Sequence, residues 1–386
     1  AGVDIPGYIS LISHERYADA VRLIRKDNPF VAACAMVCEH PCEARCRRNM
    51  VDDAINIRAL KRYAVDHAGT VPAPACAEPT GKNIAVLGGG PGGLSAAYYL
   101  ALMGHHVEVF EKHKKLGGML RYGIPSYRLP REMLEEDVEM IVSTGITVHT
   151  GVEVGKDITL PQLNESFDCI YISIGAQSDK KMGIEGEDKR GVISAVQMLR
   201  NIGDGTLPDF NKKRVVVVGG GNVAMDVART AMRMGVRDVK VVMRSDRCTA
   251  NIEEREYAEI EGAQFIFNKA PDEICDDGVY FRDTVCDENH RVTSVSRERK
   301  LMRADTVMIC VSQRPSKLIL TQTDKIEVDG RGLVKIDGQG ETTYPGVFAS
   351  GDIVRGARTV VEAVETSKRV ACAIHEYLQS NHGTEH

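Results

Sequence analysis

The sequence predicts an α/β protein with two parallel-sheet domains of one kind, preceded by a small helical domain. The chain has 386 residues, 43% of them hydrophobic, which suffices for two or three domains with buried cores. Two segments, 83–112 and 214–243, each show a strand, a glycine-rich loop, a helix pattern and a second strand. The first 70 residues show helical periodicity instead, and four cysteines stand there in one row.

Residues 1–70 are predicted to form the helical domain. The stretches "HERYADAVRLIRKDNPF" and "INIRALKRYAVDHA" carry apolar residues at helical spacing, and the first ends at an Asn-Pro pair. Because the chain begins at Ala1 rather than at a methionine, we expect this domain to be incomplete at its N-terminus. Residues 71–82 are rich in Pro and Ala and have no periodicity, so they predict a linker and a domain boundary.

The first glycine-rich loop predicts a dinucleotide site. Its pattern, G-x-G-x-x-G, directly follows a strand and opens a helix. One glycine permits the tight turn, the second lets the backbone approach a pyrophosphate, and the third lets helix and strand pack closely. The helix N-terminus would face the phosphates. The residues concerned are Gly88, Gly90, Pro91 and Gly93. A glycine-rich turn without a ligand is the alternative.

An acidic residue closes the same unit. Glu111 lies at the end of the second strand, about 20 residues after the loop, where a carboxylate can accept hydrogen bonds from a ribose diol. Lys112 follows it and is included in the predicted site. Strand, loop, helix, second strand and terminal acid occur together, and this combination is far more specific than the glycine pattern alone.

The second unit has the loop pattern G-x-G-x-x-A and a basic ending. The predicted binding residues of its loop are Gly219, Gly221, Asn222, Val223 and Ala224. Its second strand runs into "MRSDR", so Arg244, Ser245 and Arg247 stand where the first unit has its acid. Two arginines can surround a 2′-phosphate that a carboxylate would repel, which favours NADP over NAD. Two solvated surface arginines are the alternative.

Two such units predict two dinucleotides that exchange electrons, and the usual pair is FAD with a nicotinamide nucleotide. We therefore predict two Rossmann-like dinucleotide-binding domains. The FAD-binding domain would consist of 83–180 and 309–386, with the NAD(P)-binding domain, 181–308, between its two parts.

Three segments resemble the glutamate synthase small-subunit family. "AVLGGGPGGLSAAYYLALMGHHVEVFEKHKKLGGMLRYGIPSYRLP" is similar to its FAD-binding half, "VVVVGGGNVAMDVARTAMRMG" to its NADPH half, and "VFASGDIVRGARTVVEAV" to the segment that closes the FAD site. The family includes the large subunit of ferredoxin-dependent NADH:NADP transhydrogenase and the N-terminal part of dihydropyrimidine dehydrogenase. The resemblance covers nearly the whole chain and implies that the two nucleotide domains are arranged as in the disulfide oxidoreductases.

The resemblance implies further residues of the flavin site. They are Gly117, Gly118, Met119, Gly175, Gly351, Asp352, Thr359 and Val360. Asp352 would hold the ribityl–pyrophosphate part. Thr359 and Val360 would start the last helix, whose dipole stabilises negative charge on a reduced flavin. The family usually has glycine where this chain has Ser312.

The row "CAMVCEHPCEARC" contains Cys34, Cys38, Cys42 and Cys46 at equal spacing. Closely spaced thiolates without a histidine at zinc-finger spacing favour an iron–sulfur cluster, although the spacing alone does not decide, and structural zinc is the alternative. By the resemblance, Cys38, Cys42 and Cys46 would be ligands of a [4Fe–4S] cluster. Cys34 would substitute for a ligand that relatives place where this chain has Lys61.

The residues and the resemblance together predict an NAD(P)H-dependent flavin oxidoreductase subunit. It would exchange hydride between NADP(H) and FAD and relay single electrons through the [4Fe–4S] cluster to a partner subunit or ferredoxin. A hetero-oligomer is expected, with an electron-bifurcating complex as one setting. The alternatives are the small subunit of glutamate synthase with a glutamate-forming partner, a reductase acting alone, and a non-catalytic FAD-containing docking subunit.

Hydride transfer needs no acid–base residue, so no catalytic side chain is predicted. Glu253, Glu254 and Glu256 follow the NADP strand and are expected on an exposed helix face. The cysteines outside the row, such as Cys169 and Cys372, lie in or beside apolar runs and are expected in the core.

Composition narrows the possible partners and location. The net charge of −5 gives no sign of nucleic-acid binding. No apolar run reaches the roughly 18–20 residues that span a bilayer, and no secretory signal is visible, so a cytoplasmic protein is expected.

Overall fold

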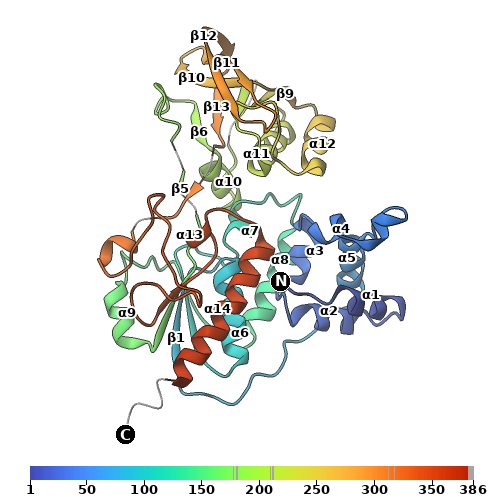
Figure 1. Cartoon of the computed structure of the whole chain (residues 1–386), viewed down its shortest axis with the longest axis vertical. Coiled ribbons are helices and arrows are strands. Elements are labelled where there is room, and N and C mark those ends of the chain that lie inside the picture. The colour runs from blue at the N-terminus through green and yellow to red at the C-terminus, as the bar shows by residue number, and fades with distance from the viewer. Residues whose placement is uncertain are drawn as a thin grey trace. The chain divides into compact units, whose positions relative to one another are not determined.

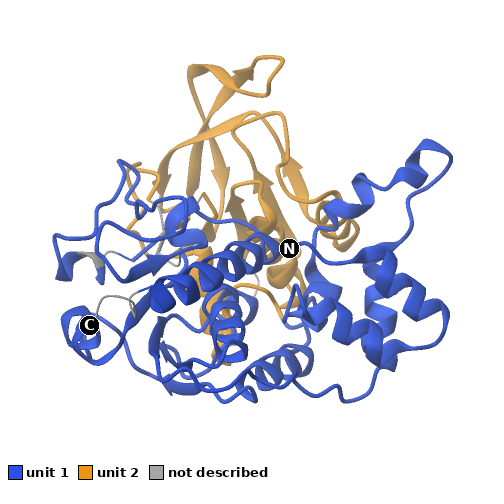
Figure 2. Cartoon of the chain, turned by 60° about the horizontal axis from the view of Figure 1, so that its bottom comes forward, with its two compact units in different colours: residues 1–121, 126–178, 314–386 blue, residues 122–125, 179–313 orange. Residues whose placement is uncertain are grey.

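The structure is a computed structural model that describes residues 1–176, 178–179, 181–208, 210, 213–311, 313–316 and 318–380, so Ser312 lies outside the described residues. The chain forms two compact units, shown in blue and orange in Figure 2. Unit 1 contains residues 1–121, 126–178 and 314–386. Unit 2 contains residues 122–125 and 179–313.

Short helices build the first part of unit 1. They are α1 (Ile5–Ser13), α2 (Tyr17–Arg25), α3 (Val31–Val37), α4 (Pro41–Ala44), the 3₁₀ turn η1 (Arg47–Met50) and α5 (Ile57–His67). Tyr8, Ile24 and Ala64 are fully buried between them, because helical spacing places the apolar residues on one face. The side chains of Asp4 and Asn56 cap α1 and α5 by accepting first-turn N–H groups. Residues 71–82, all of them described, contain no helix or strand.

A five-stranded parallel sheet is the centre of unit 1, in the order β15–β4–β1–β2–β3. Its strands are β1 (Asn83–Leu87), β2 (His106–Glu111), β3 (Thr147–Thr150), β4 (Cys169–Ile172) and β15 (Val347–Ala349). The chain runs from β1 to β2 on one side and returns to β4 on the other side of β1. Ligands bind at such switch points, outside the carboxyl ends of the strands.

Helices cover this sheet. The crossover helix α6 (Pro91–Leu102) is buried along most of its length, and the last helix α14 (Val360–Ser380) packs along it, as Figure 1 shows. Shorter or outer elements of unit 1 are α7 (Met119–Tyr122), α8 (Arg131–Val142), α9 (Leu160–Ser166), η2 (Leu320–Gln322) and α13 (Asp352–Arg355). The two short strands β5 (Ser178–Asp179) and β14 (Gln313–Arg314) pair with each other.

Unit 2 repeats the parallel sheet in the order β6–β13–β7–β8–β9. The strands are β6 (Val192–Ser194), β7 (Arg214–Val218), β8 (Asp238–Val242), β9 (Gln264–Ile266) and β13 (Thr306–Ile309). The helices are α10 (Ala195–Gly203), α11 (Asn222–Arg233) and α12 (Ile252–Glu261). The predicted α/β fold with two Rossmann-like sheets after a helical region is thereby confirmed.

Unit 2 also contains a three-stranded antiparallel sheet that the sequence analysis did not predict. It consists of β10 (Lys269–Cys275), β11 (Gly278–Cys286) and β12 (Val292–Arg303). Ile274, Val279 and Phe281 on one face are buried, whereas most of β12 is exposed. The residues of β12 therefore carry little of the hydrophobic alternation by which strands are recognised.

The expected burial of the single cysteines is only partly correct. Cys169 is buried in β4, but Cys76 and Cys372 are exposed. Cys372 lies on the outer side of α14, because an apolar neighbourhood in the sequence does not fix which face of a helix a residue occupies. Among the described residues, no helix is both long and apolar enough to cross a membrane.

Candidate functional site

The first glycine loop has no room for side chains at two of its positions. Gly88 follows β1 with φ +107°, and a Cβ there would lie 2.5 Å from the carbonyl oxygen of Ser173. A Cβ on Gly93 would lie 1.8 Å from the carbonyl oxygen of Gly88. The first turn of α6, which begins at Pro91, therefore sits directly on the end of β1. This leaves backbone rather than side chains at the helix N-terminus, as phosphate binding requires.

A second glycine segment packs against this loop. Gly117 donates its N–H to the carbonyl oxygen of Gly89 at 2.8 Å. A Cβ on Gly118, which has φ +51°, would lie 2.6 Å from Cα of Gly90. Met119 follows and begins α7. The structure thus brings together two groups of predicted flavin-site residues that lie apart in the sequence.

Glu111 lies at the end of β2 and is buried. Its Oε2 accepts the N–H of Gly89 at 2.7 Å, and its Oε1 accepts the N–H of His113 at 2.8 Å. Each carboxylate oxygen keeps a second lone pair, so the same group that braces the loop can still accept from a ribose. Lys112, next to it, is exposed.

The last segment of the chain reaches the same end of the sheet. Gly351, with φ +76°, precedes Asp352 at the start of α13. Burial raises the pKa of Asp352 to about 6, although the N–H of Arg358 donates to it at 3.1 Å. Thr359 and Glu362 bond reciprocally at the start of α14, with Oγ1 donating to Oε2 at 2.8 Å and the N–H of Glu362 returning to Oγ1 at 3.3 Å.

The elements around the first loop meet closely. A Cβ on Gly92 would lie 2.3 Å from Oγ of Ser173 and 3.3 Å from Oγ of Ser367, which belongs to α14. Gly175, with φ +69°, lies just beyond Ser173. The free backbone of the loop, the accepting carboxylate and the helix N-terminus fit the pyrophosphate and ribose of a dinucleotide such as FAD.

The second glycine loop has the same construction with one difference. Gly219 has φ +138°, and a Cβ there would lie 2.4 Å from the carbonyl oxygen of Cys310. Gly221 caps α11, which begins at Asn222, and Val223 packs against the core of the unit. Ala224 is fully buried where the first loop has its third glycine.

The segment that follows β8 is hydrogen-bonded to this second loop. The carbonyl oxygen of Gly220 accepts the N–H groups of Thr249 at 2.9 Å and Ala250 at 2.8 Å. Oδ1 of Asn222 accepts the N–H of Asn251 at 2.8 Å. The segment includes the predicted residues Arg244, Ser245 and Arg247, and both arginines are exposed. Exposed guanidinium groups beside a free glycine loop fit the 2′-phosphate of NADP.

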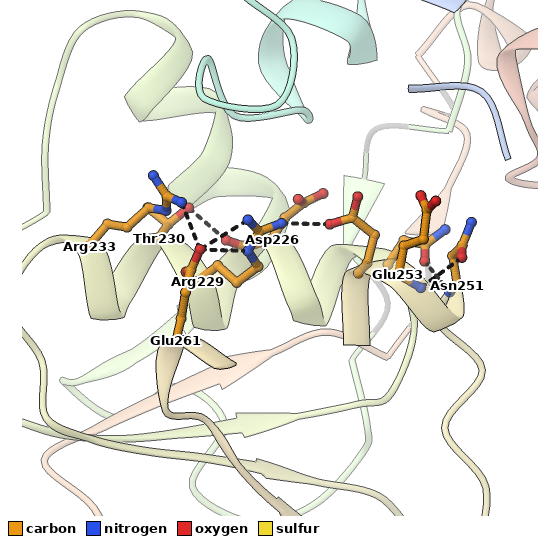
Figure 3. Close-up of polar contacts among 9 residues, drawn as sticks. Asp226, Arg229, Thr230, Arg233, Asn251, Glu253 and Glu261 are labelled. Atoms are coloured by element: carbon orange, nitrogen blue, oxygen red, sulfur yellow. Dashed lines mark hydrogen bonds and ion pairs between the residues drawn. The ribbon is translucent and has the colours of Figure 1, made fainter. Parts of the chain in front are cut away.

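Ion pairs join helix α12 to α11 (Figure 3). The guanidinium of Arg229 donates to Glu254 at 2.8 Å and to Glu261 at 3.0 Å, and Arg233 donates to Glu261 at 2.7 Å. The side chain of Glu254 is only 12% exposed. The expectation of an exposed face is therefore wrong for Glu254, whose partner comes from another helix, and for Glu253, which is half-buried, while Glu256 is exposed as expected.

The cysteine row is not one helix. Helix α3 ends at Val37, His40 has φ +40°, and Pro41 starts α4, so the chain turns between Cys38 and Cys42. The row therefore cannot be treated as a stack of thiols four residues apart on one helix face.

The thiols differ in their surroundings. Burial raises the pKa of Cys34 to about 11, although the Lys61 ammonium acts against this shift. The pKa of Cys46 is lowered, chiefly because the N–H groups of Ile55 and Arg48 donate to its sulfur. Cys46 thus fits a thiolate ligand, whereas Cys34 fits a buried thiol of the helix core.

The four cysteines do not fit a complete metal site. In the part of the chain that the structure describes, no group of three or more His, Cys, Asp or Glu side chains is placed to hold a metal ion. Cys34, Cys38 and Cys42 interact electrostatically, and burial raises the pKa of Cys42 as well.

Two family models match the chain. The model for pyridine nucleotide-disulphide oxidoreductases matches residues 82–367. The model for dihydropyrimidine dehydrogenase domain II, 4Fe–4S cluster, matches residues 1–71. The iron–sulfur model thus matches a range that precedes the range of the oxidoreductase model along the chain.

Curated relatives match almost the whole chain. The beta subunit of the NADP(+)-dependent formate dehydrogenase of Moorella thermoacetica is 37% identical over 98% of this chain and 59% of its own length. The beta subunit of the NADPH-Fe(3+) oxidoreductase of Geobacter sulfurreducens is 33% identical over 98% of this chain and 62% of its own. The small chain of the NADPH glutamate synthase of Escherichia coli is 31% identical over 97% of this chain and 86% of its own. The chain thus spans less than two thirds of the first two.

Solved structures share the fold. FprA from Mycobacterium tuberculosis in complex with NADPH has a TM-score of 0.67 at 20% identity, over 79% of this chain and 86% of that chain. Thioredoxin reductase from T. acidophilum has a TM-score of 0.59 at 22% identity, over 77% of this chain and 99% of that chain. The chain therefore belongs to the glutamate synthase small-chain family of pyridine nucleotide-disulphide oxidoreductases, with a 4Fe–4S domain at its N-terminal end.

Proposed function

We propose that this chain is the subunit that exchanges hydride between NADP(H) and FAD and passes electrons to a partner subunit or ferredoxin. One observation carries the proposal. Each of the two α/β units has a glycine loop whose backbone is free of side chains at the N-terminus of a buried helix. Two such loops in one chain serve two nucleotides, and two nucleotides exchanging electrons are the usual reason for such a pair.

In the flavin half, the N–H groups of the first loop would bind the pyrophosphate, and Glu111 would accept from a ribose. The residues proposed to complete this site are Gly88, Gly90, Pro91, Gly93, Lys112, Gly117, Gly118, Met119, Gly175, Gly351, Asp352, Thr359 and Val360. When bound, FAD supplies a hydride acceptor that can release its electrons singly. The chain's own residues bind and orient the nucleotides, and no acid–base side chain is required.

In the nicotinamide half, we propose that the second loop binds the dinucleotide. The residues are Gly219, Gly221, Asn222, Val223, Ala224, Arg244, Ser245 and Arg247. The two arginines favour NADP over NAD because each can pair with a 2′-phosphate. The domain division proposed with these sites is 1–70, 83–180 with 309–386, and 181–308.

In the N-terminal part, we propose Cys38, Cys42 and Cys46 as thiolate ligands of a [4Fe–4S] cluster and Cys34 as a core residue of α3. Because these thiols do not converge in the described chain, further ligands would come from another polypeptide segment. All described cysteines are free thiols, which suits the reducing cytoplasm.

The partner is proposed from the relatives. Two of them are named beta subunits and a third a small chain, so a partner subunit that accepts or donates electrons is expected. The small subunit of glutamate synthase is the second candidate. It is favoured by the 86% of the Escherichia coli small chain that this chain spans. Purification of the native complex distinguishes the two candidate functions, because each predicts a different partner.

An anaerobic titration followed in the visible spectrum tests the proposal. NADPH is added to the purified FAD-loaded chain, with NADH in a parallel run. We expect NADPH to bleach the flavin at lower concentration than NADH. If neither nucleotide bleaches the flavin, the chain is a docking subunit and the proposed hydride exchange is wrong.

A further inference from the structure

The antiparallel sheet of unit 2 reaches the segment proposed to hold the 2′-phosphate. Oγ1 of Thr284, on β11, donates to the carbonyl oxygen of Arg244 at 2.6 Å. The N–H of Asn268 donates to the carbonyl oxygen of Ser245 at 3.2 Å. The ring Nδ1 of His290, in the β11–β12 turn, lies 2.9 Å from Oδ1 of Asp246. Three contacts thus join this sheet and the loop and turn next to its strands to three consecutive residues of the segment.

The turn that carries His290 has a specific shape. Oδ1 of Asp287 accepts the N–H groups of Asn289 at 2.9 Å and Arg291 at 2.8 Å. The N–H of His290 donates to the carbonyl oxygen of Asp287 at 2.9 Å. His290 itself has φ +60°, a conformation that non-glycine residues seldom adopt and that surrounding contacts must hold. Hydrogen bonds within the turn therefore hold the backbone that carries the His290 imidazole.

The contact engages the carboxylate that lies within the proposed phosphate site. Asp246 stands between Ser245 and Arg247 in the sequence. A free carboxylate at this position would repel a 2′-phosphate, and a carboxylate in this segment is also what typically recognises the ribose diol of NAD. Because a carboxylate oxygen only accepts, Nδ1 of His290 carries the proton in this contact.

We propose that His290 is a specificity-determining residue for NADP(H). By donating a hydrogen bond to Asp246, it holds the one acid in the arginine segment and keeps that carboxylate from competing with the 2′-phosphate. The inference rests on the proposed function, because it takes Arg244 and Arg247 as the phosphate-binding residues.

The experiment measures binding of 2′,5′-ADP and 5′-AMP to the whole FAD-loaded chain by calorimetry. We expect His290→Ala to weaken 2′,5′-ADP binding about fivefold, the scale of one exposed charge facing a dianion, and to leave 5′-AMP unchanged. His290→Gln keeps an N–H donor and should retain most of the affinity. Asn289→Ala, in the same turn, is the matched control and should bind as the unaltered chain does.

A double variant makes the test specific. In an Asp246→Asn background there is no charge to offset, so His290→Ala should no longer weaken 2′,5′-ADP binding. An equal loss in both backgrounds, or no loss with His290→Ala alone, overturns the inference. If the unaltered chain binds 2′,5′-ADP no better than 5′-AMP, the assignment of the arginines fails instead, so the two failures can be told apart.

Discussion

Gly93 is the residue with the least room in the first glycine loop. A Cβ there would lie 1.8 Å from the carbonyl oxygen of Gly88. We expect Gly93→Ala to push α6 away from β1, lower the free energy of unfolding by about 1–3 kcal/mol and reduce the FAD content of the purified protein. Gly330→Ala is the control, because a Cβ there meets no atom within 4 Å. Undiminished FAD content in Gly93→Ala would show that the loop tolerates a side chain.

Because of His105, we expect the free energy of unfolding to depend on pH. Its ring is buried, with Nδ1 2.7 Å from Oγ1 of Thr80 and Nε2 2.8 Å from Nδ1 of His375. Burial, with a smaller contribution from His375, lowers the pKa of His105 from 6.5 to about 4. The unfolded chain therefore binds more protons between these values. The contribution of the neutral ring is complete above about pH 6.5 and is lost toward pH 4, by at most about 3 kcal/mol.

Urea unfolding at pH 7 and pH 5 checks this expectation. The unaltered chain should lose stability at pH 5, and His105→Asn should lose less between the same two pH values. The exposed neighbour His106 provides the control variant, His106→Asn, which should behave as the unaltered chain does. An unchanged pH dependence in His105→Asn would assign the effect to other groups.

At the scale of elements, Glu254 joins α12 to α11. Glu254→Gln would remove one of the ion pairs of Arg229, whose side chain is 7% exposed, and keep its pair with Glu261. We expect a loss of about 1–3 kcal/mol in unfolding free energy, because a buried guanidinium loses one charged acceptor. The rate of flavin reduction at saturating NADPH should not change, since the pair lies outside the proposed binding residues.

Glu256→Gln, on the exposed face of the same helix, is the matched variant for Glu254→Gln and should leave stability within about 0.5 kcal/mol. Stopped-flow measurement of flavin reduction and urea unfolding of both variants separate an effect on the reduction rate from an effect on stability. A slowed reduction in Glu254→Gln at normal stability would place this carboxylate in the chemistry after all.

Elements differ in how well the sequence predicts them. The units around β1 and β7 were predictable because fully buried strands and glycine loops leave strong local signals. The antiparallel sheet was missed because β12 is mostly exposed and carries several charged residues. The burial of Glu254 was missed because an acid on a helix looks the same whether it faces solvent or an arginine 25 residues away.

Contacts between elements that lie far apart in the chain could likewise not be predicted from the sequence. Asp137, on α8, is buried and accepts the N–H groups of Ala32 at 3.2 Å and Ala33 at 2.8 Å, at the start of α3. This carboxylate caps a helix more than a hundred residues earlier in the chain. No local pattern around Asp137 indicates it, since its neighbours read as one more acidic helix face.

At the scale of the whole molecule, the family and the cofactor types followed from motifs that lie close together in the sequence. The complete ligand set of the predicted cluster could not be predicted from the cysteine row in the same way, because metal ligation depends on side chains that converge from separate segments.

The interruption of unit 1 by unit 2 has a consequence for biosynthesis. Strand β15 and helix α14, which complete the first sheet and cover α6, are translated after all of unit 2. Domains generally fold as units during synthesis, earlier parts first. A nascent chain would therefore display an unfinished first sheet while the second one closes, although the first strand of that sheet emerges early.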